Sequence, residues 1–285
     1  MQPCRLCQAD ALHPFAQEER QGLPYTIVHC RRCQAVQTLE QYEAVSPDYV
    51  NLPSSALDAD HLWCQSAHKQ AAFQQWQAIT HPLWPDEPRP LLDVGCGTGG
   101  FLHFAATQGW QPYGFDASAA QASHAQKKFS QVRQASNCQD YLQQCTHPPA
   151  FAMITLWDVL EHLRDPHTVM QQLHAALADE GLLFLSIPNA GALFWKRFLY
   201  RLLARPLSLD PWEHVFYYAP QTLQHMLPQW GFRVEQIGSV VCYPRPWSLF
   251  ELQRRVGFAL LNRLPTLAPQ IYCIARKVSQ RKSPT

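Results

Sequence analysis

Short apolar runs alternate with amphipathic segments from residue 90 onward. The runs predict strands, and the segments between them have the apolar spacing of helices. Strands are predicted at 90–95, 111–116, 131–135, 151–157, 182–187, 232–239 and 270–276, and helices near 99–109, 118–129, 139–145, 166–178 and 219–230. This alternation predicts an α/β fold with a mainly parallel, doubly wound, Rossmann-like sheet of seven strands.

The stretch before residue 90 predicts a connector followed by a helix. Ser55 is the expected N-cap, and four prolines between residues 80 and 90 end the segment. The apolar positions of this helix are Leu57, Leu62, Trp63, Ala67, Ala71, Phe73, Trp76 and Ile79. The predicted domains are therefore a small module at 1–40, a connector and helix at 41–89, and a large domain at 90–279 with inserts near 190–212 and 244–268.

Both inserts combine apolar and basic residues. On a helix, Arg197, Arg201 and Arg205 lie along one side of the first insert at four-residue spacing. Its apolar residues are Leu193, Phe194, Trp195, Phe198, Leu199, Leu202 and Leu203. Such a segment fits peripheral contact of residues 192–205 with a membrane, a lid over a hydrophobic substrate, or an insertion packed on the protein's own body.

Composition narrows the class of protein. The chain has 285 residues, 47% of them hydrophobic and 16% charged, with a formal net charge of +1. A near-neutral chain is not expected to be a dedicated nucleic-acid binder. The N-terminus lacks the apolar core of a signal peptide, and no run of about 18 apolar residues predicts a spanning helix. We expect a cytoplasmic protein, with peripheral contact at the inner membrane surface through the first insert.

Four of the ten cysteines form two CxxC pairs, Cys4 with Cys7 and Cys30 with Cys33. Each pair can direct two thiolates at one ion, and structural zinc takes four such ligands in a tetrahedron. The pattern predicts a zinc ribbon with short strands between the pairs; free thiols are the alternative, and a redox CxxC is less favoured. Loss of the metal is expected to unfold residues 1–33 while the large domain, with a core of its own, stays folded.

Four glycines follow the first predicted strand of the large domain, at Gly95, Gly97, Gly99 and Gly100 in "LLDVGCGTGGFL". Their spacing fits GxGxxG, which by itself is weak evidence for a dinucleotide site. Asp93, at the strand end, would repel a pyrophosphate but can steady an amino group. Asp116, which ends the next strand, can accept hydrogen bonds from ribose hydroxyls.

These residues resemble the class I S-adenosylmethionine-dependent methyltransferases. The resemblance runs from about residue 60 to 277 and includes "LLDVGCGTGGFL", "GFDAS", "ITLWDVLEHLRDPH", "GLLFLSIPN" and "WEHVFYYAPQTLQHML" in the order of that family. It implies a Rossmann-like methyltransferase fold and S-adenosylmethionine as cofactor, and is much less specific for the acceptor.

The resemblance also implies the positions that contact the cofactor. Asp93, Gly95, Gly97 and Gly99 would contact its methionine part, and Asp116 would hold the ribose. Asn137, where the family often has an acid, and the Cys138 amide would face the adenine. Trp157 and Asp158 would border the methyl group and the acceptor. Cys96 and Ala117 complete the expected cofactor-binding set.

Three residues near the expected reaction centre are candidate catalytic groups: Glu161, His162 and His214. A histidine there can take the proton of a hydroxyl, although Glu161 and His162 could equally order the loop. The Asn/Asp-Pro-Pro-aromatic loop for base amines is missing, since the corresponding residues are "LWDV". We expect O-methylation of a small-molecule, lipid-linked or glycan-type acceptor.

Two alternatives stay open. One is an RNA methyltransferase whose ribbon contacts phosphate through Arg31 and Arg32. The other is a non-catalytic scaffold that binds the cofactor, because the glycine loop and Asp116 indicate binding and not turnover. The oligomeric state is not determined by the sequence.

Overall fold

The computed structural model describes residues 2–20, 22–40, 57, 64–83, 89–203, 209, 211, 213–240 and 265–278. Ser55, Leu62, Trp63, Arg205 and most of the second predicted insert lie outside these residues. The described residues form two sheets, one of seven strands and one of four.

The seven-stranded sheet has the order β10-β11-β8-β7-β4-β5-β6. Its strands are β4 (Pro90–Val94), β5 (Gln111–Asp116), β6 (Val132–Gln134), β7 (Phe151–Trp157), β8 (Leu177–Pro188), β10 (Phe232–Ser239) and β11 (Gln270–Lys277). β11 pairs antiparallel with both of its neighbours, whereas β6, β5, β4, β7 and β8 are mutually parallel. The carboxyl ends of the parallel strands therefore meet at one edge, which is where such sheets bind ligands.

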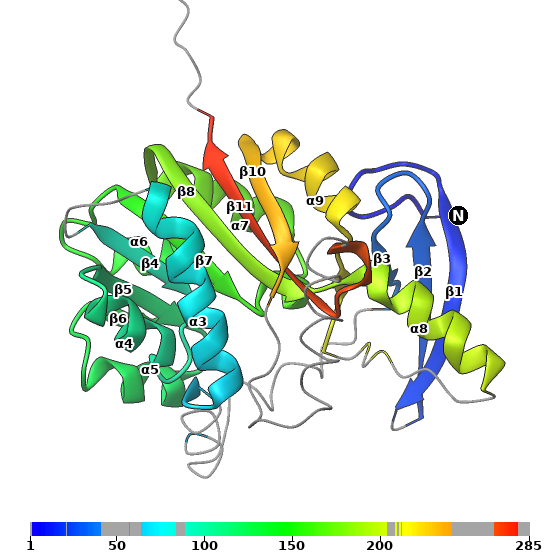
Figure 1. Cartoon of the computed structure of the whole chain (residues 1–285), viewed down its shortest axis with the longest axis horizontal. Coiled ribbons are helices and arrows are strands. Elements are labelled where there is room, and N and C mark those ends of the chain that lie inside the picture. The colour runs from blue at the N-terminus through cyan, green and yellow to red at the C-terminus, as the bar shows by residue number, and fades with distance from the viewer. Residues whose placement is uncertain are drawn as a thin grey trace, which may run out of the picture.

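Helices cover both faces of this sheet (Figure 1). One face carries α3 (Ala67–Thr80), α4 (Gly100–Thr107) and α5 (Ala119–Gln126); the other carries α6 (Cys138–Gln143), α7 (Pro166–Ala176) and α9 (Pro220–Met226). Neighbouring strand residues point to opposite faces, so that Leu91 and Met153 pack in one cluster and Leu92 and Ile154 in the other. A sheet buried on both sides explains the nearly continuous apolar runs of its strands.

The predicted strands and helices of the large domain are confirmed, with shifts at their ends. The helix expected at 219–230 stops as an α-helix at Met226, and a 3-10 turn (Pro228–Trp230) follows, because proline lacks the N–H that would continue the helix. The single helix expected from Leu57 is interrupted, although Leu57 and Cys64 are themselves helical. Residues 65 and 66 are not helical, and Ser66 caps α3 by accepting a hydrogen bond from the Lys69 amide.

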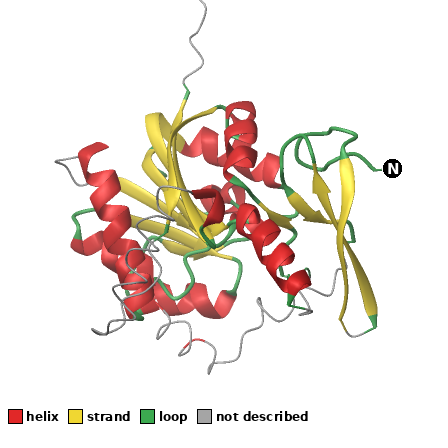
Figure 2. Cartoon of the chain, turned by 45° about the vertical axis from the view of Figure 1, so that its right-hand side comes forward, coloured by secondary structure: helices red, strands yellow, loops and turns green. Residues whose placement is uncertain are grey.

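The four-stranded sheet joins the N-terminal module to the rest of the chain. β1 (Leu12–Arg20), β2 (Leu23–Cys30) and β3 (Val36–Thr38) form antiparallel pairs, and β3 then pairs with β9 (Phe216–Tyr217). The strands stand beside the main sheet in Figure 2. α8 (Ala190–Leu202), in the first insert, packs on this sheet. Among the described residues, no helix combines the length and apolarity needed to cross a bilayer.

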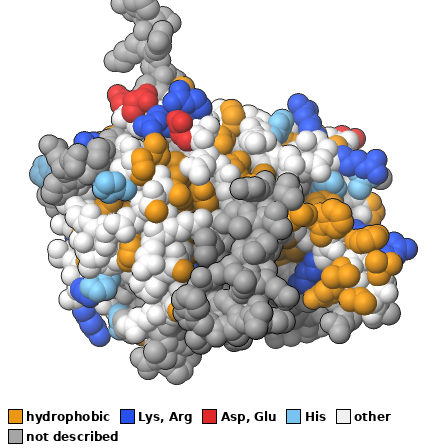
Figure 3. All heavy atoms as spheres, in the orientation of Figure 1, with side chains coloured by type: hydrophobic (Ala, Val, Ile, Leu, Met, Phe, Trp, Pro, Cys, Tyr) orange, Lys and Arg blue, Asp and Glu red, His pale blue; other side chains and the backbone are white. Residues whose placement is uncertain are grey.

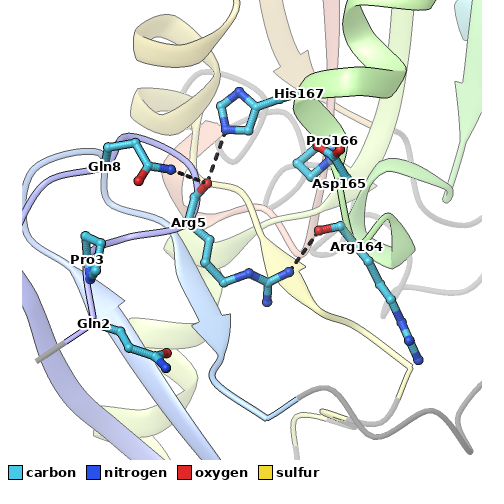
Figure 4. A pocket seen from close by; sticks show the side chains of 8 residues that line it. All are labelled: Gln2, Pro3, Arg5, Gln8, Arg164, Asp165, Pro166 and His167. Atoms are coloured by element: carbon cyan, nitrogen blue, oxygen red, sulfur yellow. Dashed lines mark hydrogen bonds between the residues drawn. The ribbon is translucent and has the colours of Figure 1, made fainter.

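The first CxxC turn docks on the N-terminal end of α7 (Figure 4). The Arg5 guanidinium donates to the Arg164 carbonyl at 2.9 Å and lies 4.7 Å from the Phe216 ring centre. The Arg5 carbonyl accepts a hydrogen bond from His167 Nε2 at 3.2 Å, and His167 Nδ1 accepts one from the Trp230 indole at 3.0 Å. These contacts border a cavity of about 390 Å³ lined by Arg5, Arg164 and His167 among others.

The N-terminal module and the large domain share one buried cluster. Cys4, Leu6, Cys30, Cys33 and Ala35 belong to the same cluster as the buried residues of β7, β8 and α9. The second cluster of the large domain, which includes Trp76, Phe101 and Met153, contains no residue of the ribbon. That the large domain stays folded without the ribbon remains a prediction.

Candidate active site

The glycine loop turns sharply between β4 and α4. Gly95, Gly97 and Gly99 have φ values of 67°, 54° and 84°, in the left-handed region that glycine adopts without strain. A Cβ on Gly95 would lie 2.7 Å from Cγ2 of Val159, so a side chain there would also collide with the loop after β7. The glycines thus let the backbone pass close to the ends of β5 and β7.

Asp116 ties the glycine loop to the end of β5. Its buried carboxylate accepts the Gly97 amide at 2.9 Å and the Ser118 amide at 2.8 Å, while the Cys96 amide donates to the Phe115 carbonyl at 3.0 Å. These two amides fix the position of the carboxylate at the end of β5. Asp116 therefore anchors the glycine loop, a role that sequence reasoning did not foresee. Its expected role is that of the ribose ligand.

Asp93 is buried below the loop, where Thr155 Oγ1 donates to it at 2.7 Å. The pKa of Asp93 is raised to about 8, mainly by burial; the Thr155 hydrogen bond opposes this shift and the nearby Asp116 charge contributes to it. A neutral Asp93 is poised to ionise when a cation approaches. This property fits the amino and sulfonium groups of S-adenosylmethionine.

Asp158 follows β7 with a φ of 56°, and three contacts hold it there. Lys69 Nζ on α3 lies 2.6 Å from Oδ2, Gln270 Nε2 on β11 donates to Oδ1 at 2.5 Å, and the Asp158 amide donates to the Ser186 carbonyl at 2.8 Å. Sequence reasoning missed Lys69 and Gln270. The available signal was that Lys69 falls in helical register with the apolar Phe73 and Trp76.

Trp157 forms part of an aromatic wall next to this carboxylate. Its ring centre lies 5.1 Å from that of Phe73, 5.0 Å from Phe101 and 4.8 Å from Phe184. The buried Trp157 indole N–H has no hydrogen-bond partner within the part of the chain that the structure describes. The wall joins α3, α4 and β8 at the edge that carries the glycine loop.

The residues expected near the adenine, Asn137 and Cys138, lie at the N-terminal end of α6. The Asn137 side chain caps α6 by accepting a hydrogen bond from the Asp140 amide at 3.0 Å, so part of its acceptor capacity is already used. Cys138 is buried at the start of that helix. Ala117 connects Asp116 to Ser118, the N-cap of α5, and its carbonyl accepts a hydrogen bond from Gln134.

The structure brings Glu161, His162 and His214 together, although His214 comes from a distant segment. One possible ligand atom from each residue lies within 4.8 Å of the other two, so the trio could also hold a metal ion. His162 Nδ1 is 2.8 Å from the Glu213 carbonyl. Because a carbonyl only accepts, Nδ1 carries the hydrogen, and Nε2 of the neutral ring keeps its lone pair.

Glu161 is fully buried below the two imidazoles. Neither carboxyl oxygen has a hydrogen-bond partner among the described residues. Burial raises the pKa of Glu161 well above its usual range, and the Asp158 charge adds to this effect. The raised pKa favours the protonated acid, whereas an adjacent positive charge would favour the carboxylate.

The four cysteines of the N-terminal module converge with matching backbone geometry. Gln8 and Gln34, which follow the second cysteine of each pair, have φ values of 57° and 65°, and each amide donates back to the first cysteine's carbonyl. Sγ of Cys4 lies 3.7 Å from that of Cys33, and Sγ of Cys7 lies 3.6 Å from that of Cys30. Zinc–sulfur bonds of about 2.3 Å in a tetrahedron separate the sulfurs by about 3.8 Å, so these donors fit zinc.

Comparison with known proteins concerns the large domain and its fold. Residues 67–237, more than half of the chain, match the family model described as a methyltransferase domain. The plantazolicin methyltransferase BpumL bound to SAH has a TM-score of 0.53 at 16% identity, covering 83% of this chain and 95% of that one. The Synechocystis PCC 6803 magnesium protoporphyrin IX methyltransferase ChlM, also with SAH, has a TM-score of 0.52 at 15% identity, covering 82% and 98%.

Curated relatives include two ubiquinone biosynthesis O-methyltransferases. The protein of Glaesserella parasuis serovar 5 (strain SH0165) is 31% identical over 115 residues, which are 36% of this chain and 47% of that protein. The protein of Coxiella burnetii (strain RSA 331 / Henzerling II) is 27% identical over 174 residues, 59% and 73% of the two chains. This chain thus spans about half the length of the first of these relatives.

The fold and the glycine loop define a class I S-adenosylmethionine-dependent methyltransferase. The chain belongs to the family with this methyltransferase domain.

Proposed function

We propose that this methyltransferase methylates a hydroxyl oxygen of a small, hydrophobic acceptor. The observation that carries the proposal is the histidine pair His162 and His214, which lies close to the buried Glu161 carboxyl. The O-methyltransferases among the relatives support oxygen as the acceptor atom. Trp157, which is partly exposed at the end of β7, supports an acceptor with apolar surface.

The chain's residues have to align the two reactants and remove one proton. The bound cofactor supplies a methyl group on a sulfonium, which is already electrophilic. The glycine loop, Asp93 and Asp116 bind and orient the cofactor. Nε2 of His162, left unprotonated by the contact with Glu213, takes the hydroxyl proton as the oxygen attacks. The imidazolium that forms keeps its Nδ1 hydrogen bond to the Glu213 carbonyl and returns the extra proton to solvent from the exposed ring.

The test is methyl transfer from labelled cofactor to phenols with and without an alkyl tail, to free sugars and to RNA. Tailed phenols are expected to be methylated. His162→Gln should lower kcat by about 10²-fold or more, which is the usual contribution of a positioned base, while cofactor affinity stays unchanged. His225→Gln, a half-buried histidine in the last turn of α9, is the matched control.

Three results would contradict this proposal. Methylation of RNA alone would move the acceptor to nucleic acid. Full activity of both His162→Gln and His214→Gln would show that neither histidine acts as the general base. Activity lost on dialysis against a chelator, with the zinc content unchanged, would reassign the trio to metal binding.

We also propose that Cys4, Cys7, Cys30 and Cys33 hold one structural zinc ion. The sulfur separations and the two matching turns support this assignment. The ion would stabilise the turn that carries Arg5, and through Arg5 the contact with Arg164 and Phe216.

A further inference from the structure

The surface of α8 carries an apolar face that nothing in the described structure covers. Trp195, Phe198, Leu199, Leu202 and Leu203 are 60%, 59%, 50%, 67% and 54% exposed. They follow the spacing i, i+3, i+4, i+7 and i+8, which places them along one side of the helix. Figure 3 shows this face as a continuous hydrophobic area on the right of the molecule. We call these five residues the α8 face.

The other side of α8 is firmly packed, so the exposed face is not a sign of a loose helix. Ala190, Leu193 and Phe194 belong to the cluster formed with β1, β2 and β9. The Phe194 ring centre lies 5.3 Å from that of Phe15 and 4.7 Å from that of His29. One side of α8 therefore packs against the N-terminal sheet, and the opposite side is exposed.

Basic residues accompany the α8 face. Lys196 and Arg201 are exposed, and the helix contains no acidic residue although the whole chain is nearly neutral. Arg197, in contrast, lies 4.6 Å from the Phe15 ring centre and packs toward the N-terminal sheet. The expectation that Arg197, Arg201 and Arg205 share one side that faces lipid is therefore wrong for Arg197, and Arg205 lies outside the described residues. The exposed cations of the described helix are Arg201 and Lys196, whose ammonium lies 5.4 Å from the Tyr200 ring centre.

We propose that the α8 face binds the surface of an anionic lipid bilayer, with the helix lying in the plane of the interface. Apolar side chains on one side and flanking cations are the combination that such a surface recognises. Burial of five large side chains would anchor the helix, and Lys196 and Arg201 would meet the negative headgroups.

α8 is also connected directly to the edge of the sheet that carries the candidate active site. α8 begins two residues after β8 ends at Pro188, and the Asn189 side chain between them donates to the carbonyls of Pro265 and Ala268. The carboxyl end of β8 is part of the edge that carries Asp158, through the Ser186 carbonyl. An acceptor dissolved in the bilayer would have a short path to that edge; this consequence alone rests on the proposed function.

The experiment measures sedimentation of the full chain with vesicles of phosphatidylcholine and phosphatidylglycerol, in the absence of any acceptor. Binding is expected to the mixed vesicles and to be much weaker to phosphatidylcholine alone. Lys196→Glu with Arg201→Glu should weaken it by about thirty-fold or more, because each basic residue near an anionic leaflet contributes about five-fold. Lys127→Glu with Lys128→Glu, exposed after α5, makes the same charge change elsewhere and should have little effect.

A second variant tests the apolar contribution. Phe198→Ser with Leu202→Ser should reduce vesicle binding by about ten-fold or more, while the melting temperature stays the same because both side chains are exposed. Raised salt should weaken binding of the native chain. Absence of binding to mixed vesicles, or equal effects of both charge variants, would overturn the proposal. So would a native dimer that Phe198→Ser dissociates, since a second copy would then cover the face.

Discussion

Asp93 is the residue whose protonation the fold controls most directly. It lies under the glycine loop with Thr155 as its hydrogen-bond donor, and burial raises its pKa to about 8. A carboxyl with a raised pKa holds its proton in the folded protein, so its ionisation costs stability as pH rises from the unfolded value toward 8. A cationic cofactor reverses this preference by favouring the carboxylate.

Cofactor binding is therefore expected to release a proton from Asp93. The affinity for S-adenosylmethionine should increase between about pH 6 and pH 8, by up to about ten-fold per pH unit, and level off above the pKa. Calorimetry in buffers of different ionisation enthalpy measures the proton directly. Asp93→Asn keeps the shape of the side chain and should abolish the release of this proton on cofactor binding. If the variant shows the native pH dependence, the proton comes from elsewhere.

At the scale of elements, one ion pair joins α3 to the loop after β7 at the candidate active site. Lys69 is nearly buried on the side of α3 that carries Phe73 and Trp76, and it meets Asp158 at 2.6 Å. Asp158 is itself held with a positive φ, which costs energy for a residue other than glycine. The ion pair thus fixes both the loop after β7 and the position of α3 against the sheet.

Lys69→Met is expected to destabilise the protein by about 1–3 kcal/mol, below the cost of breaking a fully buried pair because Asp158 is one-third exposed. Lys69→Met combined with Asp158→Asn should recover part of that loss, because no unpaired charge stays in the site. Urea denaturation of both single variants and the double variant gives the coupling energy. Strict additivity would show that the pair does not stabilise the fold.

The whole molecule is built so that the cysteine module supports the candidate active site. β3 pairs with β9, and β9 follows Glu213 and His214 directly. The Val215 amide donates to the Glu161 carbonyl at 2.9 Å, which ties the same segment to the loop after β7. Order in the module is therefore transmitted to the histidine pair through backbone hydrogen bonds.

Elemental analysis should find one zinc per chain, and Cys30→Ser should lose it. We expect the loss to lower the melting temperature of the whole chain and to speed hydrogen exchange at residues 213–218, because β9 then loses an ordered partner. Cys145→Ser, a cysteine outside the cluster, should change neither. Native protein without metal would refute the zinc site. Unchanged exchange at 213–218 in Cys30→Ser would show that the two modules are independent after all.

Much of the chain's local structure could be predicted from the sequence alone. Apolar runs fixed the seven strands of the main sheet, and the glycines after β4 predicted the turn because positive φ values at Gly95, Gly97 and Gly99 are a property of the residues themselves. The CxxC spacing likewise predicted that each cysteine pair shares one turn. In each case the information lies within a few neighbouring residues.

The tertiary structure decided which distant residues meet. Lys69 and Gln270 reach Asp158 across 89 and 112 residues, and Arg5 reaches the Arg164 carbonyl across 159. The chain has 23 basic and 22 acidic residues, so sequence pattern could not select these partners. The same holds for α8, whose amphipathic pattern is local. Only packing of Phe194 and Arg197 against Phe15 determined which side of that helix stays free.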